Sequence, residues 1–186
     1  HKQVFIISGG LAEPVRGFGK RLGVPPENIR AVELEYNQLS GEWWRYNEPQ
    51  QQARQTYLDY DEGPLTVSSG KPAIVEELAA GRYGRRLMIG DGASDLATRP
   101  VVDMFVGFGG VAARQKVADG ADIYVPVNTL APILPIAAGA PGYARVVGTP
   151  HQTVFERGIA LALNSGAHFH DDDQRAAFAA AFVKGS

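Results

Sequence analysis

Short apolar runs alternate with amphipathic stretches from residue 4 to about residue 125. Runs rich in β-branched and aromatic residues predict strands at 4–7, 31–36, 42–46, 87–89, 104–108 and 122–125, the second and third forming a hairpin insertion. Apolar residues at helical spacing predict helices at 11–22, 71–80, 93–103 and 111–118. Strands that alternate with helices are typical of an α/β fold, so we expect a Rossmann-like, doubly wound and mostly parallel sheet.

The last part of the chain follows a different pattern. From 137 to 150 it is rich in Gly, Ala and Pro, which predicts a linker. Apolar faces over 153–163 and 172–183 predict two helices that pack on the domain or on a second subunit. We therefore expect a core over 1–136 and an extension over 137–186, made of the linker and the two helices.

The composition excludes several classes of protein. The 186 residues are 45% hydrophobic and 20% charged with a net charge of −2, which suits a globular domain and disfavours nucleic acid as a partner. No apolar run is long enough to predict a membrane span, and no secretion signal is recognisable. The lack of cysteine excludes disulfides and thiolate metal sites. By elimination, we expect a cytoplasmic protein.

Two groups suited to an anion stand at the starts of predicted helices. Ser8-Gly9-Gly10 offers a hydroxyl and backbone N–H groups that can hold phosphate, and glycine permits a close approach. The alternative is a tight turn that needs glycine only for its backbone. Lys71 lies where the helix dipole disfavours a cation unless an anion is near. Its alternative interpretation is a solvated loop residue.

Two carboxylates follow the predicted strand at 87–89, in the segment Gly90-Asp91-Gly92-Ala93-Ser94-Asp95. Oxygen ligands without sulfur or imidazole favour Mg²⁺ at Asp91 and Asp95. The alternative is an Asx turn with a helix cap, for which Asp is equally suited. Because ligands gather at the carboxyl ends of parallel strands, the three polar groups together predict one site for a phosphorylated substrate and its metal.

A further group of metal-ligating residue types lies near the end of the chain. His168, His170 and Asp171–Asp173 have the chemistry of a metal site. We favour the alternative, a polar loop followed by an acidic helix start, because the helix dipole stabilises Asp at that position.

The order of the motifs resembles a known superfamily. Ile7–Gly10, Ser69–Lys71 and Ile89–Asp95 are similar to the second, third and fourth motifs of the haloacid dehalogenase superfamily. Within it, the chain most resembles the phosphoserine phosphatase family, which is also similar at Phe105–Gly110 and in the Arg114-Gln115 pair that follows. The resemblance runs from about Val4 to Val125, and it implies the fold and the chemistry of that superfamily.

The resemblance implies a role for each matching residue. The phosphate-binding residues would be Ser8, Gly9, Gly10, Lys71 and Ser94. The catalytic residues would be Lys71, Asp91 and Asp95, with Asp91 as a ligand of Mg²⁺ and Asp95 in support of the metal. These roles agree with the physical requirements of phosphoryl transfer, which is catalysed mainly by positioning and charge stabilisation.

One motif of the superfamily is missing. Its members begin with Asp-x-Asp, whose first carboxylate attacks phosphorus to form an aspartyl-phosphate, and no such motif precedes Val4. Asp59-Tyr60-Asp61 has the right spelling, but we reject it because Glu62-Gly63-Pro64 ends any strand there. In the family, the missing strand is central, between those expected here at 4–7 and 87–89, and a substrate-gripping cap follows it. We therefore expect this chain to be the carboxyl-terminal portion of a longer phosphatase, inactive without its nucleophile.

The sequence thus predicts magnesium-dependent hydrolysis of a small phosphomonoester, phosphoserine above all, as a step of serine biosynthesis. The partners we expect are this phosphorylated substrate and either a second copy of the chain or a separate amino-terminal segment. Two alternatives stay open. The first is a phosphatase of the same superfamily that acts on another small phosphomonoester, and the second is a non-catalytic module that binds phosphate without the nucleophile.

Overall fold

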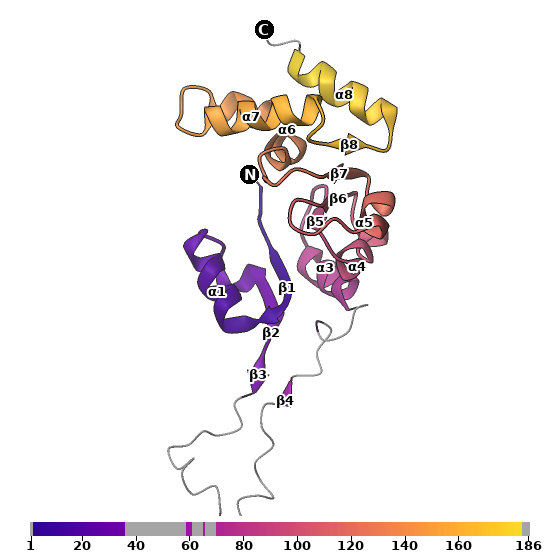
Figure 1. Ribbon diagram of the computed structural model, residues 1–186. Coiled ribbons are helices and arrows are strands. Elements are labelled where there is room, and N and C mark those ends of the chain that lie inside the picture. Colours follow the sequence, from indigo (N-terminus) through magenta and orange to yellow (C-terminus); the bar gives the residue numbers. More distant parts are fainter. Residues whose placement is uncertain (1, 36–58, 61–64, 66–69, 184–186) are drawn as a thin grey trace, which may run out of the picture. The chain divides into compact units, whose positions relative to one another are not determined.

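The computed structural model describes residues 2–35, 59–60, 65 and 70–183 (Figure 1). The chain forms two compact units, His1–Ala80 and Gly81–Ser186, which we call the first and the second unit. Both contain parallel strands and helices. The predicted α/β class is therefore confirmed.

The first unit begins with a strand, a helix and a second, parallel strand. These are β1 (Ile6–Leu11), α1 (Ala12–Arg21) and β2 (Ile29–Val32), with the short 3₁₀ helix η1 (Pro26–Asn28) before β2. Ile6 pairs with Ile29 and Leu11 with Val32, and the register shifts between these two pairs. This bulge falls on the Ser-Gly-Gly segment, which the sequence analysis expects in a loop after the strand.

Helix α1 ends where the sequence predicts. Gly23 has a φ of +75°, a left-handed conformation that favours glycine, and the N–H of Val24 donates to the carbonyl of Gly19 at 2.9 Å. The face of α1 that packs on the strands is made of small residues, Ala12 and Gly19, both of which are buried. Phe18 is 61% exposed, so the large apolar residues of α1 are not its core face.

The rest of the first unit contains a short ribbon and a third helix. Strand β3 (Leu34–Glu35) pairs antiparallel with β4 (Asp59–Tyr60). The predicted hairpin strand at 42–46 lies outside the described residues. Helix α3 (Lys71–Ala79) begins with Lys71 and Pro72 as predicted, and Gly81 follows it with a φ of +69°.

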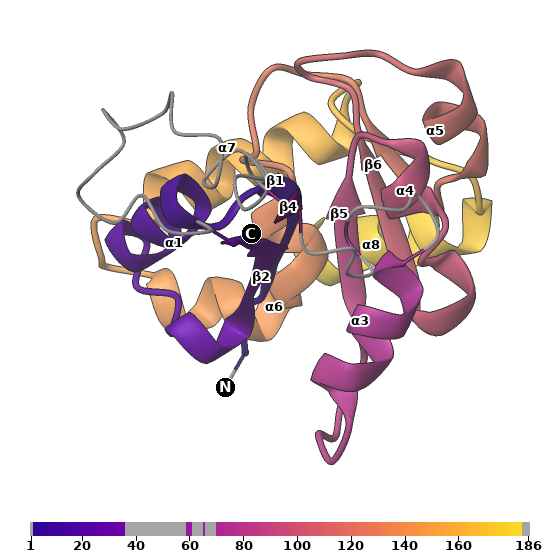
Figure 2. The ribbon, with the colours of Figure 1, turned by 90° about the horizontal axis from the view of Figure 1, so that it is seen from below.

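A four-stranded sheet forms the centre of the second unit, in the order β5-β6-β7-β8. Its strands are β5 (Leu87–Gly90), β6 (Met104–Phe108), β7 (Ile123–Val125) and β8 (His168–Phe169). The first three run parallel, as β5 and β6 show side by side in Figure 2, and β8 is antiparallel to β7. The helical elements are α4 (Ala93–Leu96), η4 (Arg99–Val101), α5 (Gln115–Gly120), α6 (Ile133–Val146), α7 (Gln152–Leu163) and α8 (Asp172–Val183).

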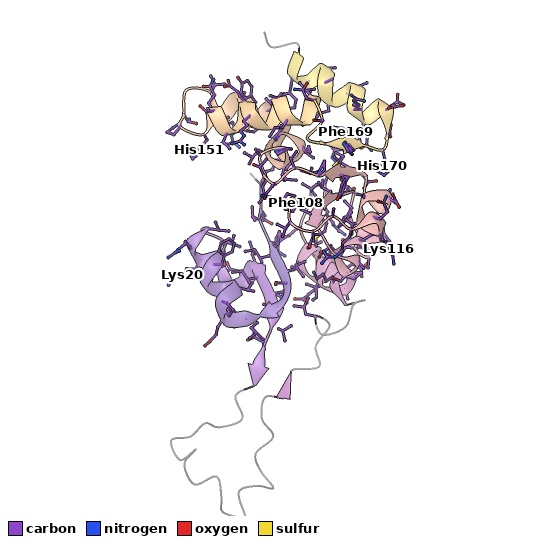
Figure 3. The ribbon with its side chains drawn as sticks, in the orientation of Figure 1. Lys20, Phe108, Lys116, His151, Phe169 and His170 are labelled. Carbon is purple, nitrogen blue, oxygen red and sulfur yellow. The ribbon has the colours of Figure 1, made fainter. Side chains whose placement is uncertain are left out.

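Successive residues of β6 enter two different hydrophobic clusters. Phe105 packs in a cluster with Val117 of α5, whereas Val106 packs with residues of α6 and α7. Because successive side chains of a strand point to opposite faces, helices cover both faces of this sheet. Phe108 and Phe169, which Figure 3 labels, pack against the cluster that contains Val106.

The end of the chain is part of this core. Helix α6 occupies most of the segment for which the sequence predicts a linker, in two helical pieces that meet at Gly139, where φ is +62°. Ile133 at its start is buried in the same cluster as Ala162 of α7, and Phe178 of α8 packs against that cluster. Tertiary packing therefore stabilises as helix a segment whose composition favours a loop. The two predicted helices after it are confirmed and pack on the sheet.

The described strands do not join into one sheet. Among them, β1 pairs only with β2, and β5 has β6 as its single neighbour. A continuous sheet made from these residues would have contradicted the expected missing strand, which itself stays a prediction. Within the described ranges, no helix is both long and apolar enough to cross a membrane.

Candidate functional site

The Ser8-Gly9-Gly10 turn is a bulge inside β1. The hydroxyl oxygen of Ser8 accepts a hydrogen bond from the N–H of Gly10 at 3.1 Å. Gly9 and Gly10 are exposed, whereas Ser8 is half-buried. A Cβ on Gly10 would lie 3.3 Å from the Ser8 hydroxyl, a tight contact that favours glycine there. The hydrogen bond between Gly10 and Ser8 thus stabilises the turn, and its two glycines are exposed to solvent.

Lys71 is the first residue of α3 and lies in the same unit as the turn. Its side chain is half-buried, and the first turn of α3 contains no acidic residue. A Cβ on Gly9 would lie 3.8 Å from the carbonyl oxygen of Leu65, so part of the chain between β4 and α3 passes beside the turn. The roles of Ser8, Gly9, Gly10 and Lys71 toward phosphate stay predictions.

In the second unit, Asp95 folds back over the end of β5. The N–H of Gly92 donates to Oδ2 of Asp95 at 3.0 Å, and Thr98 Oγ1 donates to the carbonyl of Asp95 at 2.6 Å. Asp95 is only 7% exposed. A Cβ on Gly90 would overlap the Asp95 side chain, so glycine at the end of β5 makes room for this carboxylate. The helix-cap interpretation is therefore confirmed for Asp95, and it leaves a role beside a metal open.

Asp91 follows β5 directly and has a different environment. Its side chain is 46% exposed, and its Oδ2 accepts a hydrogen bond from Nη1 of Arg114 at 2.5 Å. The same nitrogen donates to the backbone carbonyl of Asp91 at 2.7 Å. Ser94, on the first turn of α4, is half-buried, and a Cβ on Gly92 would lie 3.8 Å from its hydroxyl. Asp91 and Asp95 thus both follow the end of β5, and the carboxylate of Asp91 is exposed whereas that of Asp95 is buried.

Arg114 is the residue that sequence reasoning about the site missed. It lies at the end of the loop after β6, and β6 is the parallel neighbour of β5, with Gly107 opposite Gly90. The carboxyl ends of neighbouring parallel strands meet at one edge of the sheet. An arginine in the loop after the predicted strand 104–108 could therefore have been recognised as a site residue. Parallel neighbouring strands place that loop near the carboxylates that follow 87–89.

The histidine-rich segment is used for structure. The carboxylate of Asp171 accepts hydrogen bonds from the N–H groups of Asp173 at 2.8 Å and Gln174 at 3.3 Å, which caps the start of α8. His168 lies in β8, and the N–H of His170, labelled in Figure 3, donates to the carbonyl of Asp122. No three His, Asp or Glu residues of the described part are grouped to hold a metal. The polar-loop interpretation is the one that this arrangement supports.

The loop of Asp91 and Asp95 fits Mg²⁺ in the chemistry of its donors. Magnesium is commonly held by one or two carboxylates, while water and substrate phosphate complete its six ligands. Two carboxylate side chains after one strand match that number, although the described residues add no third acidic or imidazole group. Asp91 would be the direct ligand because its carboxylate is exposed, and Asp95 would support it from the buried side.

Comparisons with known proteins give relatives for two thirds of the chain. Over 124 residues it is 33% identical to phosphoserine phosphatase of Bos taurus and 34% identical to that of Homo sapiens, covering 66% of this chain and 49% of each relative. Over 123 residues it is 37% identical to the chloroplastic phosphoserine phosphatase of Arabidopsis thaliana, covering 64% of this chain and 37% of that protein. The chain therefore spans about half or less of the length of these relatives.

Among solved structures, the chain is similar to a phosphoserine phosphohydrolase-like protein from Francisella tularensis. The TM-score is 0.48 at 25% identity, over 68% of this chain and 52% of that chain. No protein-family model matches the chain.

Proposed function

Because this chain is related to the phosphoserine phosphatases of the haloacid dehalogenase superfamily, we propose that it is part of a phosphatase that hydrolyses a small phosphomonoester. Phosphoserine is the proposed substrate, with serine and phosphate as products, and serine biosynthesis is the proposed context. The identity of 33–37% to phosphoserine phosphatases over about two thirds of the chain is the observation that carries the proposal. A cytoplasmic location stays a prediction.

The proposed roles follow the chemistry of the side chains. Ser8 would donate its hydroxyl hydrogen to a phosphoryl oxygen, since its oxygen already accepts from Gly10. The exposed N–H of Gly9 would bind the same group. In the second unit, the half-buried hydroxyl of Ser94 is the proposed phosphate-binding group. Lys71 would neutralise the charge on the phosphoryl oxygens.

Asp91 and Asp95 are the proposed holders of Mg²⁺. When bound, the ion would neutralise negative charge on the phosphoryl group and help to orient it. The buried Asp95, which accepts a 3.0 Å hydrogen bond from the N–H of Gly92, would keep the loop in shape, and Asp91 would be the residue that contacts the ion. The exposed and buried carboxylates would thus divide binding and positioning between them.

The attacking carboxylate of the proposed mechanism is expected outside these 186 residues. In the proposed reaction, an aspartate outside these 186 residues forms a bond to phosphorus while the bond from phosphorus to the serine oxygen breaks. The serine oxygen takes up a proton from the second aspartate of the same outside motif, which acts as general acid in the superfamily and regains a proton from the attacking water. Water then attacks the aspartyl-phosphate, which releases phosphate and restores the aspartate.

Phosphate release from L-phosphoserine, with magnesium and then with excess chelator, tests the proposal. We expect magnesium-dependent release from the protein with its nucleophile-bearing segment and none from the 186 residues alone. Release by the 186 residues alone would contradict an outside nucleophile. Cleavage of other phosphomonoesters in preference to phosphoserine would change the substrate. If the longer protein is folded and cleaves no phosphomonoester, a non-catalytic phosphate-binding module becomes the better interpretation.

Two substitutions in the active protein test the assigned residues. Asp91→Asn should abolish turnover because it weakens the metal site, and Lys71→Ala should lower kcat through lost charge stabilisation. Asp119→Asn and Lys116→Ala are matched controls, since both residues are exposed on α5. Full activity in a folded Asp91→Asn or Lys71→Ala protein would show that the assignment is wrong.

A further inference from the structure

The exposed carboxylate of the candidate metal site already holds a cation of the protein itself. A single nitrogen, Nη1 of Arg114, donates to both Oδ2 and the backbone carbonyl of Asp91, at 2.5 and 2.7 Å. A positive group therefore lies against the oxygen atoms that a metal ion would approach. Hydrogen bonds between ionised partners are stronger than those between neutral partners.

The backbone of Arg114 is fixed, whereas its side chain can leave the site. Its carbonyl accepts hydrogen bonds from the N–H groups of Val117 and Ala118, both at 3.0 Å, which anchors it at the start of α5. The Arg114 side chain is 52% exposed, and that of Asp91 is 46% exposed. A guanidinium at this exposure can move into water without becoming a buried, unpaired charge, which is the costly case.

A second arginine–aspartate pair of the same unit shows what a structural pair looks like. Arg99 lies 2.5 Å from Asp122, and the other oxygen of that carboxylate accepts from the N–H of Phe105 at 2.8 Å. The Asp122 side chain is only 19% exposed. The Asp122 carboxylate thus has a structural role, because it accepts a hydrogen bond from the backbone of β6. The Asp91 carboxylate, in contrast, lies in a solvent-exposed loop, where it contacts Arg114.

We propose that Arg114 is the resident counter-charge of Asp91 and that Mg²⁺ must displace it in order to bind. The inference rests on the proposed function, because it assumes that Asp91 is a ligand of magnesium. With Arg114 in this contact, its guanidinium neutralises Asp91 and occupies Oδ2 of the carboxylate. On metal binding, the guanidinium leaves Oδ2 of Asp91, and its displacement lowers the apparent affinity for the ion.

Titration calorimetry with magnesium chloride tests the competition without measuring catalysis. In the protein with its nucleophile-bearing segment, Arg114→Gln should bind Mg²⁺ about two- to fivefold more tightly, the equivalent of one exposed ion pair. Arg99→Gln is the matched control and should leave the Kd unchanged. In the same titration, an NMR signal from the Arg114 side chain should shift with magnesium, while that of Arg99 should not.

The outcomes separate this inference from the proposed function. If Asp91→Asn loses magnesium binding but Arg114→Gln keeps or weakens it, Arg114 does not compete with the ion and the inference is wrong. If neither the unaltered protein nor any variant binds magnesium, or if Asp91→Asn binds it normally, the proposed metal site is wrong and the inference falls with it. Equal tightening in Arg99→Gln would show a general charge effect and would also overturn the inference.

Discussion

The two glycine-rich turns that the sequence singled out, one in each unit, are built in opposite ways. The Ser8–Gly10 turn is a bulge in β1, with two exposed glycines and a single hydrogen bond from Gly10 to Ser8. In the loop after β5, the Asp95 carboxylate is buried and holds the N–H of Gly92. Both turns contain two glycines and a serine, and the loop after β5 adds two aspartates. What differs is how much of each turn the fold takes out of water.

Burial changes the energetic weight of the same kind of contact. A buried donor that loses its acceptor costs the full desolvation of that group, whereas an exposed donor turns to water instead. The loop after β5 should therefore respond strongly to substitution, and the turn in β1 should respond weakly. In terms of function, the first turn can adapt to a ligand, while the second supports a preformed arrangement of Asp91 and Asp95.

The largest effect should come from Gly90→Ala. Its methyl group would overlap the Asp95 side chain, and overpacking of this kind costs about 1–3 kcal/mol. Urea denaturation should show this loss in the free energy of unfolding. Gly17→Ala in α1 is the control, because nothing lies within 4 Å of its added methyl group. That control should stabilise the protein by about 0.5–1 kcal/mol, the usual gain over glycine in a helix. Equal changes in the free energy of unfolding for Gly90→Ala and Gly17→Ala would contradict the close contact expected between residue 90 and Asp95.

Asp95→Ala should follow in size. It leaves the part-buried N–H of Gly92 without its acceptor and removes the buried Asp95 carboxylate, a change that costs about 1–3 kcal/mol. Asp95→Asn retains an acceptor oxygen and nearly the same volume, so it should destabilise the protein less. The measurement is the free energy of unfolding of both variants in urea. If Asp95→Asn were as destabilising as Asp95→Ala, the charge of Asp95 would matter more than its hydrogen bond.

Ser8→Ala should have a much smaller effect on stability, within about 0.5 kcal/mol, as for surface substitutions. The N–H of Gly10 loses the Ser8 oxygen but remains at an exposed position where water can accept its hydrogen bond. Hydrogen exchange at Gly10, compared with exchange at Gly92, would show the difference directly. A loss as large as that of Asp95→Ala would mean that the turn in β1 is as firmly built as the loop after β5.

Disruption of an exposed hydrogen-bonded pair in the second unit should change the free energy of unfolding least. This result would show that the size of the change depends on burial and not on the unit in which the pair lies. Tyr143 of α6 donates to Glu156 of α7 at 2.7 Å in an exposed position. The hydrogen bond to Glu156 raises the pKa of Tyr143 above its usual 10.0. Hydrogen bonds from Gln152 and then Tyr143 lower the pKa of Glu156 below its usual 4.5.

These directions define a pH window. The contribution of Glu156 is present above its ordinary pKa and disappears as pH falls through the lowered pKa. That of Tyr143 is present below pH 10.0 and disappears as pH rises through the raised pKa. Urea denaturation of the unaltered protein at a series of pH values should therefore give a free energy of unfolding that is slightly higher between the two limits than beyond them. In Tyr143→Phe, this difference should be smaller. A steep loss at either limit that Tyr143→Phe abolishes would mean that this exposed pair is stronger than its exposure suggests.

Local patterns determined the elements whose signals are complete within a few residues. Strand β6 and helix α8 have the predicted bounds, 104–108 and 172–183, because each has a continuous apolar run or a clear acidic start. The same holds for the start of α3 at Lys71 and for the end of α1 before Gly23. The order of the motifs also predicted the resemblance to phosphoserine phosphatases, to which the chain is 33–37% identical over about two thirds of its length.

Only the tertiary structure decided features that depend on contacts between distant residues. Composition favoured a linker at 137–150, yet burial of Ile133 beside Ala162 stabilises α6 there. Helix α5 starts at Gln115, later than its apolar spacing predicted, and Val111 is 85% exposed, so this apolar residue does not pack in the core as the spacing suggested.

The candidate site divides in the same way. The residue types and spacing of Asp91 and Asp95 were visible in the sequence, but their opposite exposures were not, because only the fold buries one carboxylate and leaves the other in water. The contact of Arg114 with Asp91 joins two loops that are far apart in the sequence. Such a pair exists only because β5 and β6 lie side by side. The sequence thus determined which groups the protein offers, and the tertiary structure decided which of them meet.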